Sequence, residues 1–265
     1  MFRMYSSLFV IKFKNEMSYR TSVILSSIMM MLYSVISIFI WLAVYTFSHT
    51  ASIHGVALST TLIYFVIIGA LSPMLSWSGI ADNLYTDIKE GSIATSVIRP
   101  MSYTTQLIIT DVAQVLPNIL IVSIPIIIAV ALLANLAVTP ATAAVFLIYL
   151  LIGYIMATLF AFIIGSLAFY LTDIYGIMVS LNWGITMIGG SMLPLVFFPQ
   201  WIEHILLMLP FAYMAFTPAA TLTGMLSLNT AISLLPVAGA WIAVLLFFVY
   251  FVWKKMSVRM DTVGQ

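Results

Sequence analysis

The chain has 265 residues, of which 63% are apolar and only 6% are charged, whereas about a quarter of the residues of a soluble domain are charged. So few charges exclude a soluble enzyme, and the high hydrophobicity excludes an intrinsically disordered chain. The net charge of +1 argues against nucleic acid as the main partner. The absence of cysteine excludes disulfides, a thiol nucleophile and Cys-ligated metal sites. The composition therefore indicates a polytopic membrane protein.

Residues 1–20 are predicted to form an amphipathic helix that lies at the membrane interface. Their aromatic and apolar residues recur at helical spacing, with cations at the lipid headgroups and rings at the acyl boundary. Lys12 and Lys14 interrupt the apolar run, so a cleavable signal peptide is not expected. The alternative is a short disordered tail.

Six apolar runs are long enough to cross a bilayer core of roughly 30 Å, which takes about 20 helical residues. These predicted spans are residues 22–47, 58–77, 107–134, 141–170, 177–198 and 231–253. The runs are continuously apolar and do not alternate with polar residues, so helices are favoured over a barrel.

The stretch 211–228 is also apolar, and counting it as a full span would give seven. With six spans, all Lys and Arg residues fall on one side of the membrane, whereas a seventh would move Lys254, Lys255 and Arg259 to the other side. The positive-inside rule therefore predicts six spans with both termini in the cytoplasm, and we expect the protein in a bacterial plasma (inner) membrane. The outer connections then carry one acid, Glu203, and all three histidines.

The segment 78–103 joins the second and third spans on the inner side. Ile80, Leu84 and Ile88 recur every four residues, which predicts a short amphipathic helix that ends at Gly91. Its charged residues are Asp82, Asp87, Lys89, Glu90 and Arg99. A compact charged segment of this kind can bind a soluble partner, and the alternative is an ordinary solvated loop.

The segment 199–228 precedes the last span on the outer side. Pro199 and Pro210 bracket a predicted short helix that lies in the plane of the interface, with Trp201 as its anchor. The polar residues expected on its other face are Gln200, Glu203 and His204. Residues 211–228 would then re-enter the membrane. Non-helical backbone is tolerated at that depth only where protein or a water-filled cavity supplies hydrogen-bond partners for its N–H and C=O groups. We interpret 199–228 as a candidate outer gate, with a passive cap as the alternative.

Asp111 is the one acid inside a predicted span, near its cytoplasmic start. Water could hydrate the Asp111 carboxylate there, or Lys89 or Arg99 could pair with it. A structural role is therefore favoured over an ion site or proton relay. Asp173 is expected to cap the start of the fifth span. Gly165 and the pair at 189–190 would allow helices to approach closely.

The sequence lacks the motifs of a self-sufficient catalyst. It has no Gly-rich phosphate loop with a lysine and no helix-spaced cluster of metal ligands. The histidines lie in outer connections, so no Ser–His pair can form at membrane depth. The chain is therefore predicted to be non-catalytic. If it transports actively, the energy enters through another subunit, for which segment 78–103 is the natural dock.

Two groups of short motifs carry a resemblance to a known family. The first is Asp87-Ile-Lys-Glu-Gly91 with Val97-Ile-Arg-Pro100-Met-Ser-Tyr103, although Ser92-Ile93 departs from the usual Thr/Glu-Leu. The second comprises Gly190-Ser-Met-Leu-Pro194, Phe198-Pro199-Gln-Trp201, Leu209-Pro210-Phe211 and Thr217-Pro218. Together with the span pattern, these motifs resemble the permease subunits of ABC-2-type ABC transporters. The closest likeness is to the short six-span branch that pairs with a second permease.

The resemblance implies an all-α integral membrane protein with a single transmembrane domain over residues 1–265. Its partners would be a cytoplasmic ABC ATPase dimer, a second permease subunit in a homodimer or heterodimer, and membrane lipid. ATP and Mg would be bound by the ATPase, and this chain would hold no cofactor. The segment 82–99 would couple to the ATPase, and 199–228 would close the outer side.

The family mostly exports drugs, antimicrobial peptides, lipids or polysaccharides. A pathway lined by Met, Phe and small residues, whose few polar contacts are Thr60, Asn118 and Asn182, favours an amphiphilic cargo over a sugar. Two alternative functions remain open at this point. They are a self-contained channel or secondary carrier, and a membrane scaffold or immunity protein.

Overall fold

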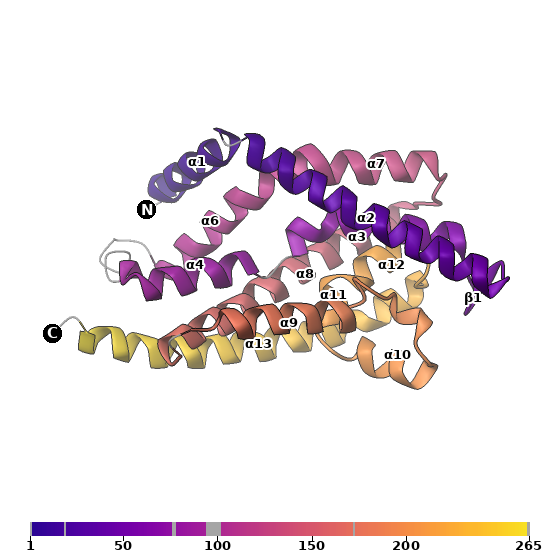
Figure 1. Cartoon of the computed structure of the whole chain (residues 1–265). Helices are drawn as coiled ribbons and strands as arrows, with labels where there is room; N and C mark the ends of the chain where they lie inside the picture. Colours follow the sequence, from indigo (N-terminus) through magenta and orange to yellow (C-terminus); the bar gives the residue numbers. More distant parts are fainter. Residues whose placement is uncertain (1, 19, 76–77, 94–101, 172, 264–265) are drawn as a thin grey trace.

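The computed structural model describes residues 2–18, 20–75, 78–93, 102–171 and 173–263, which are almost entirely helical (Figure 1). The α-helices are α1 (Phe2–Ser18), α2 (Arg20–Ser48), α3 (Leu58–Leu75), α4 (Ser78–Lys89), α6 (Tyr103–Asn118), α7 (Ile124–Leu133), α8 (Pro140–Gly165), α9 (Tyr175–Ile188), α10 (Gln200–Leu207), α11 (Phe211–Met214), α12 (Phe216–Thr223) and α13 (Leu228–Val263). Shorter helical turns are the π-helix η1 (Ile119–Ser123) and the 3₁₀ turns η2 (Ser166–Phe169) and η3 (Leu195–Phe197). One antiparallel hairpin pairs β1 (Ser52–Ile53) with β2 (Val56–Ala57).

Apolar helices pass back and forth between the two ends of the molecule in the order α2, α3–α4, α6–η1–α7, α8, α9 and α13 (Figure 1). Within the described residues, four helices are long and apolar enough to cross a membrane: Leu58–Lys89, Tyr103–Leu133, Pro140–Phe169 and Leu228–Met256. Leu32–Ser48 of α2 and Tyr175–Ile188 are shorter apolar helices. These elements confirm the prediction of an all-α membrane protein. The first residues of α1 and the last of α13 lie at the same end, as an even number of passages requires (Figure 1).

The fifth passage differs from its predicted extent of 177–198, because α9 ends at Ile188. Gly190 follows with a φ of 88°, in the left-handed region that only glycine adopts without strain. A Cβ on Gly190 would lie 2.6 Å from the Cβ of Phe216, and the Phe216 amide donates to the Gly189 carbonyl at 3.1 Å. The glycine pair therefore stops the helix so that a later segment can pack directly against its end.

That later segment is the re-entrant pair α11–α12, which is too short to cross a membrane and is buried from residue 212 to residue 223. Its backbone breaks at Ala215, where φ is −139° and ψ is −56°. The hydroxyls of Thr217 and Thr221 donate to carbonyls within the segment at 3.0 and 2.7 Å. The broken backbone is therefore enclosed by protein, and α11 and α12 are each too short to form a seventh span.

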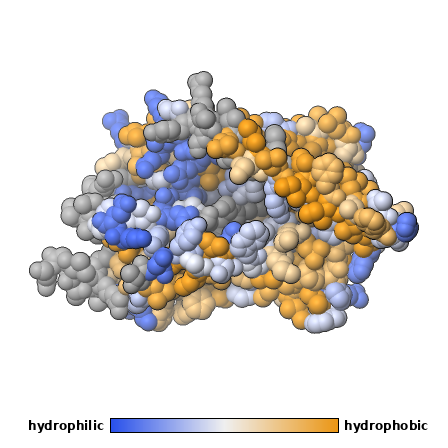
Figure 2. Space-filling view, in the orientation of Figure 1, coloured by the Kyte–Doolittle hydropathy of each residue, from blue (hydrophilic) through white to orange (hydrophobic). Residues whose placement is uncertain are grey.

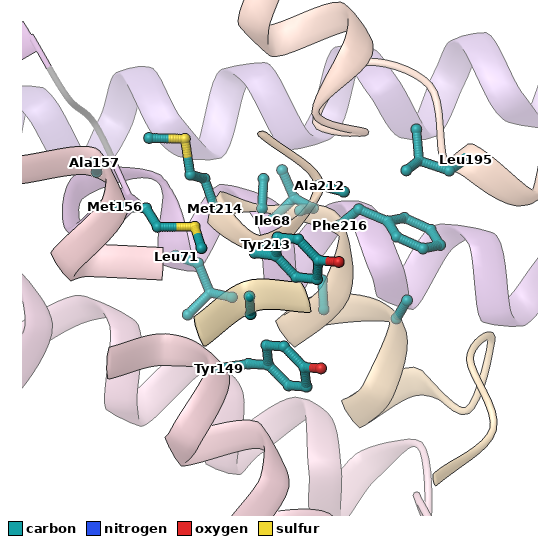
Figure 3. Packing of buried hydrophobic residues seen from close by; sticks show 14 of the residues in the cluster. Ile68, Leu71, Tyr149, Met156, Ala157, Leu195, Ala212, Tyr213, Met214 and Phe216 are labelled. Atoms are coloured by element: carbon teal, nitrogen blue, oxygen red, sulfur yellow. The ribbon is translucent and has the colours of Figure 1, made fainter. Parts of the chain in front are cut away.

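The core lies where α11 and α12 meet α3 and α8 (Figure 3). Tyr149 of α8 stacks on Tyr213 of α11 with ring centroids 6.2 Å apart. The Tyr64 hydroxyl of α3 donates to the Gly190 carbonyl at 2.7 Å, and the Tyr149 hydroxyl donates to the Ala231 carbonyl. The Gly190 carbonyl lies just beyond the end of α9, where the helix supplies no further donor, so the Tyr64 hydroxyl satisfies it. The Tyr149 hydroxyl joins α8 to the first turn of α13.

The amino-terminal helix α1 is present as predicted, but it packs along α6 (Figure 1). A stripe of residues at three- and four-residue spacing, Tyr5, Leu8, Phe9, Lys12, Phe13 and Glu16, is half-buried. Phe9 and Phe13 stack within it at 5.8 Å. The aromatic face expected at the acyl boundary is therefore partly covered by protein.

Candidate functional site

Helix α4 has the apolar face that its spacing predicts. Ile80 and Leu84 are buried, and Gly91 follows the helix with a φ of 73°, the left-handed conformation of a glycine cap. The helix does not project freely from the bundle, because it packs along α8 and contacts α6. A Cβ on Gly165 of α8 would lie 3.0 Å from the backbone of Ala81, so glycine permits the close approach that was expected of it.

The charged residues predicted to contact an ATPase are divided between the surface and the interior of this region. Asp82, Lys89 and Glu90 are exposed on α4 and just after it. Asp87 is half-buried, and Arg99 lies outside the described residues. A docking role for these residues stays a prediction.

Asp87 joins the end of α4 to the start of α6. Its Oδ1 accepts a hydrogen bond from the Ser92 hydroxyl and its Oδ2 accepts one from the Tyr103 hydroxyl, both at 2.7 Å. Tyr103 is the first residue of α6 and is only 4% exposed. The carboxylate thus positions the beginning of the third passage.

A second chain of hydrogen bonds links α4 to α9. The Lys89 ammonium donates to the Tyr85 hydroxyl at 2.9 Å, and that hydroxyl donates to Oδ1 of Asp173 at 3.1 Å. Oδ1 of Asp173 also accepts the amide N–H of Tyr175, the first residue of α9, at 2.8 Å. Asp173 therefore binds the first amide of α9, but from one residue before the N-cap position, which Ile174 occupies. The Tyr175 amide together with the Tyr85 hydroxyl lowers the pKa of Asp173. Sequence reasoning missed Tyr85, whose four-residue spacing from Lys89 was the available signal.

Helix α10 lies between Pro199 and Pro210, as predicted. Its apolar residues do not share one face, however. Leu206 and Leu207 are buried against the core, whereas Trp201 and Ile205 are 67% and 55% exposed. An exposed Trp at this position suits an interfacial anchor. Helix α10 therefore has one apolar side that packs on the protein core and a second apolar side that is exposed.

Glu203 does not lie on a fully solvated face as expected, since it is half-buried. Burial raises the pKa of its carboxyl group, while the nearby positive charges of His204 and His54 lower it. At the end of α10, the Trp241 indole N–H of α13 donates to the Met208 carbonyl at 2.7 Å. The outer segment is thereby fastened to the last passage.

A cavity of about 720 Å³ lies among α1, α2, α3, α4, α6, α9 and α11. Figure 2 shows hydrophilic residues beside a hollow in the visible face of the molecule. Apolar residues dominate the right half of that face. Cavities of about 300–1,000 Å³ hold drug-sized ligands. The polar residues that line it are Glu16, Tyr33, Ser72, Asp111, Gln114, Asn118, Asn182, Thr186 and Ser191. Its apolar wall includes Met29, Ile68, Pro73, Val115, Ile185, Phe211 and Met214.

Three polar residues were predicted to line a pathway. Asn118 and Asn182 line this cavity, whereas Thr60 does not. Phe211 and Met214 show that the re-entrant segment forms part of the cavity wall. That contribution was not predicted, because sequence spacing cannot show which face of a four-residue helix meets a distant passage.

Asp111 also lines the cavity. Of the partners considered for it, Lys89 bonds elsewhere, and Arg99 lies outside the described residues. The Oδ2 of Asp111 accepts the Tyr154 hydroxyl of α8 at 2.7 Å, while Lys89 is bonded to Tyr85. Asp111 is only 5% exposed. The structure thus brings the acid of α6 to the wall of a cavity in the membrane-spanning part of the chain.

Comparison with known proteins gives one family match. No curated protein matches the chain, but a family described as ABC-2 family transporter protein matches residues 29–264. The match extends from α2 to the end of α13 and so contains every apolar passage, the inner helix α4 and the outer segment α10–α12. The chain therefore belongs to the ABC-2 family and is a membrane-spanning permease component of an ABC transporter.

Proposed function

We propose that the chain exports an amphiphilic cargo, such as a drug, an antimicrobial peptide or a lipid-like molecule, from a bacterial cell. It would do so as one of two permease subunits, in a homodimer or heterodimer, above a cytoplasmic ATPase dimer that binds ATP and Mg. The observation that carries this proposal is the cavity of about 720 Å³, whose wall combines amides and carboxylates with methionine and aromatic side chains. A sugar would need denser polar lining, whereas an amphiphile uses both kinds of surface.

The proposed orientation places both termini, α4 and the turn before α9 in the cytoplasm. The positive-inside rule supports it, since Lys89, Lys254 and Lys255 then share one side. In this orientation α4 presents Asp82, Lys89 and Glu90 to the ATPase. The segment α10–α12 lies at the outer end and, with Pro199, Trp201, Glu203 and Pro210, forms the outer gate.

In the proposed cycle, ATP binding draws the ATPase subunits together and displaces α4 as a rigid body. The contact between Tyr85 and Asp173 transmits the displacement to α9, which lines the cavity through Asn182, Ile185 and Thr186. This chain supplies no catalytic group to ATP hydrolysis. Its contribution is to bind cargo and to move the cavity walls.

The test is uptake of a fluorescent amphiphile into inside-out membrane vesicles that contain the chain with its partner permease and ATPase. We expect uptake that requires ATP and disappears when the ATPase is catalytically inactive. Uptake by the chain alone without nucleotide would instead identify a channel or secondary carrier. Protection of cells from a toxin with an inactive ATPase would identify an immunity or scaffold protein.

A further inference from the structure

Asp111 is the starting point, because a buried acid within a membrane-spanning bundle is costly unless it has a partner or a ligand. It lies eight residues into α6, about 12 Å along the helix from Tyr103. Its side chain is 95% buried, since only 5% is exposed. Its only hydrogen bond among the described residues comes from the Tyr154 hydroxyl to Oδ2.

The second carboxylate oxygen of Asp111 has space beside it. Within the part of the chain that the structure describes, no donor reaches Oδ1 and no Lys or Arg forms an ion pair with this acid. The neighbouring residue on α4 is Gly79, where an added Cβ would lie 3.1 Å from Oδ1. Gly79 and Asp111 both line the cavity, so the absence of a side chain at 79 leaves this oxygen accessible from it.

The rest of the cavity wall favours positive charge. Glu16 of α1 is a second carboxylate, and no Lys, Arg or His occurs among the described lining residues. Two acids and no bases make the formal charge of this described lining −2. The aromatic rings of Tyr33 and Phe211 add faces that attract cations.

An inorganic ion does not explain this arrangement. Divalent cations need about six oxygen ligands at close range, and the described residues contain no group of three or more acidic, histidine or cysteine side chains that could hold a metal. The cavity is also far larger than an ion and has an extensive apolar wall. A bulky molecule that carries one positive charge fits both its size and its charge.

We propose that the cavity binds an organic cation whose charge is balanced by the Asp111 carboxylate beside Gly79. This inference rests on the proposed export function, and it specifies the charge of the cargo. Methionines 29 and 214 give the apolar wall a deformable surface that accepts different hydrophobic groups. The Tyr154 hydroxyl is a positioning group that holds Asp111 in the wall.

The test uses two probe ions of matched size and shape, tetraphenylphosphonium and tetraphenylborate. Equilibrium binding is measured to the full chain in detergent together with its copurifying partners, with protein-free micelles subtracted. We expect wild-type protein to bind tetraphenylphosphonium at least about tenfold more tightly than tetraphenylborate, the effect of one charge-assisted contact. Asp111→Asn should remove most of that preference by weakening binding of the cation alone.

Two further variants separate charge from structure. Tyr154→Phe keeps the carboxylate but removes its hydrogen bond, and we expect it to retain the preference for the cation. Gly79→Ala also keeps the charge but crowds Oδ1, and we expect it to weaken cation binding. It therefore serves in place of Asp111→Asn if that variant fails to assemble.

Equal binding of the two ions by wild-type protein would overturn the inference, as would an unchanged preference in a folded Asp111→Asn variant. In that case Asp111 serves only as the acceptor for Tyr154. Because binding is measured without nucleotide, the two proposals fail separately. Cation binding without ATP-driven transport would refute export alone, and transport of neutral amphiphiles without a charge preference would refute only this inference.

Discussion

Tyr85 of α4 donates a hydrogen bond to Asp173 at a distance of 3.1 Å, and Asp173 caps the first amide of α9. This bond joins α4 to a helix that lines the cavity through Asn182 and Thr186. In the proposed cycle, it would carry a movement of α4 to the cavity wall.

Tyr85→Phe is expected to lower the amount of cargo moved per ATP hydrolysed by about 2- to 30-fold, which corresponds to a coupling energy of about 0.5–2 kcal/mol. The ring remains to pack, so assembly with the ATPase should persist. The measurement is transport and ATP hydrolysis in the same vesicles. Tyr250→Phe, at an exposed position on α13, is the matched control. A fully coupled Tyr85→Phe protein would show that motion reaches α9 by another route.

Asp87→Ala is expected to destabilise the folded protein by about 1–3 kcal/mol, because it leaves the buried Tyr103 hydroxyl without its acceptor. Thermal unfolding in detergent measures the effect. Glu90→Ala, three residues further along and exposed, should stay within about 0.5 kcal/mol of wild type. The double variant Asp87→Ala with Tyr103→Phe should lose less than Asp87→Ala alone, since it also removes the buried Tyr103 hydroxyl that would otherwise lack an acceptor. A double variant that loses more would contradict this account.

The sequence predicts those parts of the fold that depend on local pattern. The apolar runs locate the passages, the spacing of Ile80 and Leu84 gives α4, and the prolines at 199 and 210 delimit α10. Charge distribution correctly excludes a seventh span. Each of these features follows from the period of a helix or from the cost of a charge in lipid.

The remaining features depend on contacts between residues far apart in the chain. Asp111 meets Tyr154 across 43 positions, and nothing near either residue in sequence indicates the pairing. The early end of α9 likewise depends on Phe216, which occupies the space where a Cβ on Gly190 would lie. Sequence spacing reports which residues share a helix face, but not which passage that face meets.

Glu203→Gln is expected to change how stability depends on pH. Burial raises the pKa of Glu203 above its ordinary value of 4.5, so the folded state disfavours the charged form. Below pH 4.5 the Glu203 carboxyl is protonated in both the folded and the unfolded state, so it does not affect the free energy of unfolding. As the pH rises through the raised pKa, the folded protein becomes less stable. Glu203→Gln removes that loss.

We expect the thermal unfolding temperature of Glu203→Gln to exceed that of wild type at pH 7.5 and to equal it near pH 4. The gain should stay below about 1 kcal/mol, because Glu203 is only half-buried and solvent screens it. His204 and His54 oppose the effect of burial. Replacing both histidines with Gln should therefore enlarge the difference between the two proteins at a pH where the histidines are charged. A Glu203→Gln variant that is less stable at pH 7.5 would show that these charges outweigh burial.

Gly190→Ala is expected to destabilise the protein by more than about 2 kcal/mol, through a methyl group forced against Phe216 and a φ of 88° that alanine tolerates poorly. Gly184→Ala is the matched control, because it makes the same chemical change in α9 where nothing lies within 4 Å of the new Cβ. That variant should be neutral or more stable by about 0.5–1 kcal/mol, as alanine favours a helix over glycine. Thermal unfolding of both variants measures the contrast. If the two substitutions had equal effects, the end of α9 would not be set by the contact of Gly190 with the re-entrant segment, and the outer wall of the cavity would have to be fixed elsewhere.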